Sequence, residues 1–330
     1  MSYILGIESS CDETAASVLK DGTNVLSNVI ASQIDIHKEY GGVVPEIASR
    51  AHLENIDKVV DKAIKDANIS YNDLDAVAVT NGPGLVGTLF VGVSFAKALA
   101  FSLNIPLIGV DHIMAHISVN KIENNVKDKY IALVMSGGHT HIIYFENNNS
   151  KLIGKTVDDA CGEAYDKIAR VVGLSYPGGP NVERVAKLGN ESINFPIPKT
   201  IGKYDFSFSG LKSSVINYVN TKKMKNEVIS IEDICASFQK SVAMSLVEKT
   251  KLALIDYNVD QLLLAGGVAS NKYIRSKMEE MCKKEKKELC YPSGIYCTDN
   301  AVMVARLGYE KFIEKKYDNL DLNVYSRIKY

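Results

Sequence analysis

The stretch LDAVAVTNGPGLVGTLFVGVSFAKALA, residues 74–100, decides the fold. Its first seven residues form an apolar run that predicts a buried strand, and the turn NGPG follows at residues 81–84. The apolar segment from Gly84 to Leu103 predicts a helix, and its length allows a membrane span. Lys97 and several glycines favour a buried helix instead, so we expect no membrane segment. A strand, a glycine turn and a helix in sequence are typical of α/β proteins.

The segments before and after this stretch extend the same pattern. Two apolar runs flank the polar tip ESSCD, which predicts a hairpin. Asp111 is placed to cap a helix that begins at His112. The expected elements of this half are a hairpin over residues 3–7 and 14–19, a helix over 45–67, a strand over 74–80 and a strand over 106–110.

The second half repeats this order. It contains a hairpin over residues 130–135 and 140–145, a strand over 261–265 that ends in a Gly-Gly turn, a helix over 271–287, and a helix over 301–313 that Thr298 or Asp299 is placed to cap. The separation from Gly82 to His112 is 30 residues, and that from Gly266 to Asp299 is 33. We therefore expect a structural duplication, with halves at residues 1–122 and 123–330 and a ligand site in the cleft between them. The last helix is able to pack back on the first half.

The composition bears on nucleic-acid binding and on the cellular compartment. The chain has 330 residues and a formal net charge of −1, so it lacks the global basic field of a typical nucleic-acid binder. Its six cysteines include no C-x-x-C pair, and the start shows no leader pattern. These features predict reduced thiols and a cytoplasmic protein.

Three glycine turns expose backbone amides that suit a phosphate or adenosine: Ser136-Gly137-Gly138, Gly178-Gly179-Pro180 and Gly266-Gly267. Neither a P-loop nor a G-x-G-x-x-G motif is present. The turns therefore predict a nucleotide site that uses neither motif. The alternative is that the glycines are present only because the backbone there has a positive φ.

His112 and His116 in the sequence DHIMAH are spaced i, i+4 on one helix face, where both can reach one metal ion. The alternative is a pair of partly buried histidines on an amphipathic helix. Ile113 occupies the position where an H-E-x-x-H metallopeptidase has its Glu base, so that mechanism is disfavoured. The duplicated layout suggests Asp299 as a third ligand, giving a set that suits Fe(II) or Zn(II).

The remaining polar residues are interpreted as structural. The pair His139 and His141 is more typical of scaffold than of a metal site, and His37 and His52 are expected at the surface or in helix packing. Glu8 and Asp12 lie near the expected cleft, and neither is given a catalytic role. Lysine runs at residues 222–225, 283–287 and 315–316 are interpreted as solvated helix ends, with an RNA-facing patch as the alternative.

Eight motifs together resemble the bacterial TsaD family of tRNA threonylcarbamoyladenosine biosynthesis proteins. They are ILGIESSCDETAASVL, NGPGLVGTLFVGVSFAKALA, DHIMAH, ALVMSGGHTHI, DDACGEAYDKIARVVGLSYPGGP, FSFSGLKS, LLLAGGVASN and CTDNAVM. The resemblance implies an α/β fold of the actin-like, sugar-kinase and Hsp70-like ATPase class, with two RNase H-like halves flanking a cleft. It also implies transfer of a threonylcarbamoyl group from threonylcarbamoyl-AMP to N6 of the adenosine 3′ of the anticodon, in tRNAs reading codons that begin with A.

The resemblance also implies site residues. His112, His116 and Asp299 match the family's metal ligands, with Fe(II) expected and Zn(II) compatible. The positions matching its substrate contacts are Met135, Ser136, Gly137, Gly138, His139, Asp166, Gly179, Glu183 and Asn271, where Glu183 replaces the Asp of many relatives.

Partners follow from the same resemblance: tRNA, threonylcarbamoyl-AMP, a TsaB-type paralogue as heterodimer partner and a TsaE-type ATPase. Two rival functions stay open at this point. One is an ATP-dependent small-molecule kinase of the same fold, and the other is a non-catalytic scaffold like the TsaB paralogue.

Overall fold

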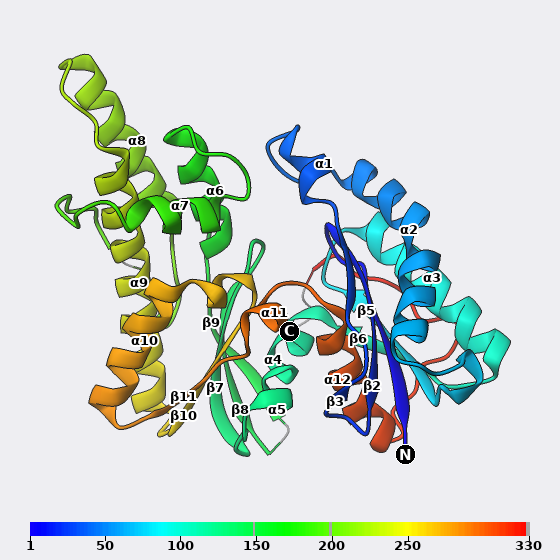
Figure 1. Ribbon diagram of the computed structural model, residues 1–330. Coiled ribbons are helices and arrows are strands. Elements are labelled where there is room, and N and C mark those ends of the chain that lie inside the picture. The colour runs from blue at the N-terminus through cyan, green and yellow to red at the C-terminus, as the bar shows by residue number, and fades with distance from the viewer. Residues whose placement is uncertain (148, 198–199, 328–330) are drawn as a thin grey trace. The chain divides into compact units, whose positions relative to one another are not determined.

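The computed structural model describes residues 1–147, 149–197 and 200–327 of the chain (Figure 1). It consists of two compact units. Unit 1 comprises Met1–Asn124 and Pro292–Tyr330, and unit 2 comprises Asn125–Tyr291. Each unit contains one mixed β-sheet with helices packed on it, so the predicted α/β class is confirmed.

Unit 1 is built on a six-stranded sheet in the order β3-β2-β1-β5-β6, with β4 paired to β2. Strands β1 and β2 form the expected antiparallel hairpin, and β5 and β6 extend it in parallel with β1. The strands are β1 (Tyr3–Glu8), β2 (Glu13–Lys20), β3 (Asn24–Val25), β4 (Val29–Ser32), β5 (Ala76–Gly82) and β6 (Leu107–Asp111). The helices are α1 (Ile34–Lys38), α2 (Pro45–Asp66), η1 (Tyr71–Asp73), α3 (Val86–Leu103), α4 (His112–Ser118), α5 (Asn120–Glu123), α11 (Gly294–Cys297) and α12 (Ala301–Ile313).

Both faces of this sheet are buried, which explains why its central strands are continuously apolar. Successive side chains of a strand point to opposite faces. Leu5 and Val77 therefore face the core formed with α2 and α3, whereas Ile4 and Ala78 face the core formed with α4 and α12.

Helix α3 is the one helix in the described part of the chain with the length and apolarity of a membrane span. It packs on β5 and on α2, and Leu89, Val93 and Ala96 are buried there. Phe90 and Phe101 on its outer side are exposed. The expected helix is thus present and packs on the core, but only one of its faces is buried, whereas the sequence predicted a buried helix.

Helix α12 lies directly against β1. A Cβ atom added at Gly6 of β1 would stand 2.4 Å from the carbonyl oxygen of Ala301 and 2.6 Å from the amide nitrogen of Ala305. The side chains of Val302, Val304 and Ala305 are fully buried in the same core. This close backbone approach places α12, and the chain on either side of it, in unit 1.

Unit 2 is built on a five-stranded sheet in the order β11-β10-β7-β8-β9. Strands β7, β8 and β9 form an antiparallel meander, and β10 and β11 run parallel to β7. The strands are β7 (Lys129–Met135), β8 (Thr140–Glu146), β9 (Asn149–Lys155), β10 (Gln261–Ala265) and β11 (Glu288–Cys290). The helices are α6 (Cys161–Val171), α7 (Gly178–Ala186), α8 (Ser209–Met224), α9 (Ile231–Asp256), η2 (Gly267–Ser270) and α10 (Lys272–Glu285).

The two sheets have matching topology. In each, a three-stranded antiparallel meander comes first, and two parallel strands are then added beyond its first strand. The expected duplication is therefore present as a repeated strand order. The halves predicted at 1–122 and 123–330 differ from these units in two respects. The boundary lies after Asn124, and the segment from Pro292 onward belongs to unit 1, because α12 packs back on β1, the possibility that the sequence left open for the last helix.

Candidate metal centre and substrate residues

Helix α4 positions the two histidines. It begins directly after β6, and Asp111 caps it as predicted, because its Oδ1 accepts a hydrogen bond from the Met114 amide at 2.9 Å. His112 is the first residue of α4, and His116 follows one turn later, so both rings project from the same face. Their ring centroids lie 4.6 Å apart and the rings are nearly perpendicular.

Asp299 comes from the loop between α11 and α12. The sequence predicted Thr298 or Asp299 as the cap of α12, and this is wrong: Asn300 is the cap, its Oδ1 accepting a hydrogen bond from the Met303 amide at 3.1 Å. The Asp299 carboxylate instead points toward the two histidines. All three residues belong to unit 1, so Asp299 lies in the same unit as the histidines and not in the other half.

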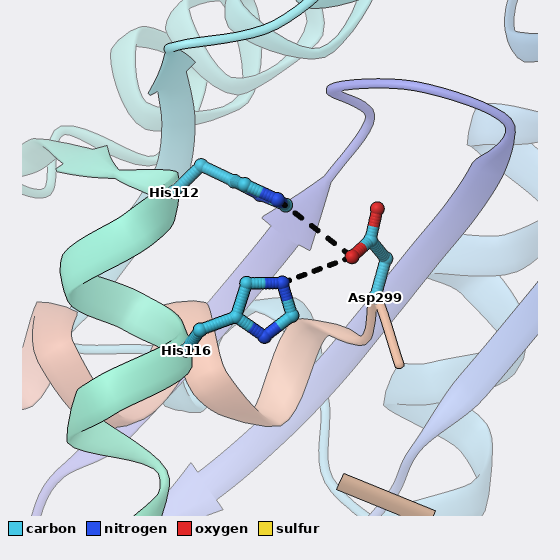
Figure 2. Close-up of side chains that lie close together, drawn as sticks. All are labelled: His112, His116 and Asp299. Atoms are coloured by element: carbon cyan, nitrogen blue, oxygen red, sulfur yellow. Dashed lines mark hydrogen bonds and ion pairs between the residues drawn. The ribbon is translucent and has the colours of Figure 1, made fainter. Parts of the chain in front are cut away.

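Figure 2 shows the resulting cluster. Asp299 Oδ1 lies 3.0 Å from His116 Nε2 and 3.7 Å from His112 Nε2. The three ligand atoms lie within 4.8 Å of one another, which is the spacing of a group that could hold a metal ion. His116 is fully buried and His112 nearly so, whereas Asp299 is partly exposed. Two imidazole nitrogens and one carboxylate oxygen suit Fe(II) or Zn(II) with coordination positions left for substrate.

Glu8 holds His112 from the other side of the ring. Its Oε2 lies 3.2 Å from His112 Nδ1, and the Ser10 hydroxyl lies 3.1 Å from the same nitrogen. The Glu8 carboxylate is fully buried, accepting hydrogen bonds from the Thr80 hydroxyl and the Ser10 amide, each at 2.6 Å. A carboxylate on Nδ1 leaves Nε2 for a metal ion and fixes the ring's orientation.

Electrostatics around the cluster favour a cation. Burial lowers the pKa of His112, but Asp299 and Glu8 outweigh it and raise that pKa to about 9. The pKa of Glu13 rises to about 10 because the group is buried and faces Asp299 and Asp12. Several carboxylates thus share a small buried volume, and a bound cation relieves their mutual repulsion. The donor set and its charge therefore fit a metal ion.

Replacing Glu8 by Gln is expected to lower the metal affinity of the full-length chain about 10- to 100-fold, because such partners of ligating histidines have effects of that size. The measurement is a titration of metal-free protein with Co(II). Glu54→Gln, an exposed glutamate on α2, should leave the affinity unchanged. An unchanged affinity in Glu8→Gln itself would show that Glu8 does not support His112.

The expected substrate residues all lie in unit 2. Met135 is buried at the end of β7, and the turn Ser136–His139 closes with the Ser136 amide donating to the His139 carbonyl at 2.8 Å. Gly137 and Gly138 face open space, with no atom within 4 Å of an added Cβ. The turn after β10 lies beside the turn Ser136–His139: a Cβ atom added at Gly266 would stand 2.4 Å from the Met135 carbonyl oxygen. Two glycine turns thus meet at the carboxyl ends of neighbouring parallel strands, where ligands of α/β sheets commonly bind.

Three of the other residues expected to contact the substrate form hydrogen bonds within unit 2. Asp166 accepts a hydrogen bond from the Gly178 amide at 2.7 Å, which joins α6 to α7. Glu183 accepts one from the Lys272 amide at 3.1 Å, and the adjacent Asn271 caps α10. Gly179 faces open space. Glu183 and Asn271 are therefore neighbours, and the substrate roles of all these residues stay predictions.

Two further histidines are structural. His37 and His52 were expected at the surface or in helix packing, and the second alternative holds, because both are fully buried residues of α1 and α2. His52 lies 2.7 Å from the Thr14 hydroxyl through Nδ1 and 3.0 Å from the Cys11 carbonyl oxygen through Nε2. It thereby fixes the tip between β1 and β2, which carries Ser10.

Known proteins are similar in sequence to this chain over nearly its full length. A protein of Clostridioides difficile named tRNA N6-adenosine threonylcarbamoyltransferase is 53% identical, covering 98% of this chain and 97% of its own length. The Bacillus subtilis protein of the same name is 51% identical, covering 96% of this chain and 93% of its own length.

Solved structures share the fold at low identity. The HypF protein of T. kodakarensis matches with a TM-score of 0.67 and 16% identity, over 97% of this chain and 49% of its own. Component A of the (R)-2-hydroxyglutaryl-CoA dehydratase of Acidaminococcus fermentans matches with a TM-score of 0.56 and 16% identity, over 94% and 99% of the two chains. These matches concern the fold alone, and they agree with the predicted actin-like, sugar-kinase and Hsp70-like class.

The TsaD family profile, described as tRNA N6-adenosine threonylcarbamoyltransferase, matches residues 24–306. This range includes His112, His116, Asp299 and every expected substrate residue of unit 2. The match covers most of the chain, and the full-length relatives carry the same name. The chain therefore belongs to the TsaD family.

Proposed function

We propose that the chain transfers the threonylcarbamoyl group of threonylcarbamoyl-AMP to N6 of the adenosine 3′ of the anticodon, in tRNAs reading codons that begin with A. The adenine N6 attacks the carbamoyl carbon, the bond from that carbon to the phosphate oxygen breaks, and AMP leaves with its electron pair while N6 loses a proton. Family membership together with the cluster of His112, His116 and Asp299 supports this reaction.

His112, His116 and Asp299 would hold the metal, with Fe(II) proposed and Zn(II) compatible. A bound metal supplies Lewis-acid polarisation of a carbonyl. Glu8 and Ser10 keep the His112 ring oriented with Nε2 toward Asp299. Metal analysis of protein purified without oxygen distinguishes iron from zinc.

We propose that the glycine turns of unit 2 bind the adenylate. The open faces of Gly137, Gly138 and Gly179 let the phosphate or the ribose approach the backbone closely. Backbone amides of the turn Ser136–His139 would stabilise the charge that grows on the phosphate as AMP leaves. Asp166, Glu183 and Asn271 are the proposed adenosine contacts.

One assay tests the function against its rivals. The purified chain is combined with partner proteins, threonylcarbamoyl-AMP and unmodified tRNA, and threonylcarbamoyl-adenosine is measured. Modified tRNA that depends on His112 and Asp299 supports the proposal. ATP-dependent phosphorylation of a small molecule without tRNA modification would identify a kinase. Modification that requires this chain but neither His112 nor Asp299 would identify a scaffold.

We propose a TsaB-type paralogue and a TsaE-type ATPase as protein partners in the cytoplasm. A surface pocket on unit 1 supports a protein partner: it lies between α2 and α3 and is lined by apolar groups of Leu53, Ile56, Phe90 and Phe95. Leu53 and Phe90 are exposed, and an apolar patch of this kind is typical of a protein interface.

The isolated chain should bind tRNA weakly, and salt should weaken that binding further. Its net charge is −1, and three lysines of its basic runs are engaged: Lys222 with Glu227, Lys287 with Asp260 and Lys316 with Glu314. Few phosphate contacts are then available, and each is weakened by salt. A filter-binding titration at two salt concentrations checks this, and tight binding that salt does not weaken would contradict it.

A further inference from the structure

The segment that follows α12, residues 318–325, runs along unit 1 and is called the C-terminal strap (Figure 1, red trace after α12). It lies on the side of the sheet where β6 is the edge strand. The Asp318 amide donates to the Leu107 carbonyl at 2.8 Å, and the Gly109 amide donates to Asp318 Oδ2 at 2.7 Å. The strap thereby pairs with backbone groups that an edge strand otherwise leaves open.

The strap continues to the end of the sheet that carries the metal ligands. The Tyr325 amide donates to the Asn81 carbonyl at 3.0 Å, and the Asn81 side-chain amide donates to the Asn323 carbonyl at 3.2 Å. Leu322 and Val324 pack against the core of unit 1. A Cβ at Gly82 would stand 2.4 Å from the Tyr325 carbonyl oxygen and 2.7 Å from its ring, so the glycine is what permits this close fit.

The last contact joins the strap to α4. The Tyr325 hydroxyl donates to Asp111 Oδ2 at 2.7 Å, while Asp111 Oδ1 accepts from the Met114 amide. Both oxygens of the capping carboxylate are thus engaged, one by the helix and one by the strap. Helix α4 has only seven residues, too few to be stable alone, so its position depends on such contacts. Its first residue is the ligand His112.

We propose that Tyr325 is a positioning residue of the metal centre: through Asp111, the C-terminal strap fixes the start of α4 and so the directions of His112 and His116. The inference rests on the metal role of these histidines in the proposed function. The C-terminal strap, which is more than 200 residues from Asp111 in sequence, thereby controls the geometry of the site.

The test uses the full-length chain and Co(II) as the probe. Tyr325→Phe keeps the ring on Gly82 and removes only the hydroxyl. It should weaken Co(II) binding about tenfold, the lower end of what the loss of one hydrogen bond to a charged group costs, and change the Co(II) absorption spectrum. Tyr317→Phe is the matched control, because that tyrosine precedes the strap and its hydroxyl donates to the Phe312 carbonyl at 3.4 Å. The control should bind Co(II) like the wild type.

A double-mutant cycle separates positioning through Asp111 from a general loss of stability. If Tyr325 acts through Asp111, Tyr325→Phe should have no further effect on Co(II) binding in an Asp111→Ala background. Wild-type Co(II) affinity in Tyr325→Phe, or additive effects in the double variant, would overturn the proposal. A separate result would show that the histidines do not bind the metal at all: His116→Ala would then bind Co(II) as tightly as the wild type.

Discussion

His116→Ala is expected to purify without stoichiometric metal and to lose threonylcarbamoyl transfer by at least about a thousandfold. The reason is that His116 Nε2 and Asp299 Oδ1, 3.0 Å apart, form one side of the ligand cluster, and the fully buried ring has no substitute among the neighbouring donors of that cluster. Lewis-acid polarisation contributes several kcal/mol to a transition state, and about 4 kcal/mol corresponds to a thousandfold in rate. The measurements are metal content per chain and the rate of tRNA modification.

The matched control is His37→Ala. His37 is also a fully buried histidine of unit 1, but its ring contacts Gln33 and the Val44 amide and not the metal ligands. This variant should lose some stability and keep its metal. Wild-type metal content or transfer in His116→Ala would refute the metal centre. Loss of metal in both variants would instead indicate that a buried histidine was needed for folding.

Among the proposed substitutions, Gly6→Ala is expected to reduce the free energy of unfolding the most. The added methyl group would collide with the backbone of α12 at Ala301 and Ala305, at 2.4 and 2.6 Å, and backbone atoms cannot rotate away. Overpacking of a core costs about 1 to 3 kcal/mol and sometimes more, so we expect at least about 3 kcal/mol here. Because Asp299 lies two residues before α12, a displaced helix should also weaken metal binding. Urea denaturation and Co(II) titration measure the two effects.

Gly210→Ala is the control for this substitution. Gly210 lies in the first turn of α8 in unit 2, and no atom lies within 4 Å of an added Cβ. Alanine there should be neutral or slightly stabilising, because it is the better helix former. A Gly6→Ala protein whose urea midpoint matches that of the wild type would show that α12 does not approach β1 as described.

The sequence was sufficient for the local part of the candidate metal centre. The spacing of His112 and His116 fixes them on one helix face, and Asp111 is recognisable as the cap. Asp299 was reached through the duplicated layout and the family resemblance. Its unit was not predicted correctly, because that depends on the contact of α12 with β1, which are almost 300 residues apart in sequence. No local pattern reports a contact over such a distance.

Glu8 was named but not given a role, since a glutamate at the end of an apolar strand also fits a solvated hairpin tip. Only the structure shows that it is fully buried and directed at His112. Helix α9 was not predicted either. Its buried residues include the consecutive run from Ile234 to Gln239, so they surround the helix and leave no single apolar stripe for periodicity to detect.

The discontinuity of unit 1 determines the order in which the chain can fold as it leaves the ribosome. Unit 2 is a continuous insertion, complete once Tyr291 has emerged, whereas unit 1 must wait for residues after Pro292. Until α12 is synthesised, Ile4, Ala78 and Ile108 lack the side chains of α12 that complete the core they share with α4. One face of this sheet is thus only partly covered while unit 2 is being synthesised, and transiently exposed apolar surface of this kind favours aggregation.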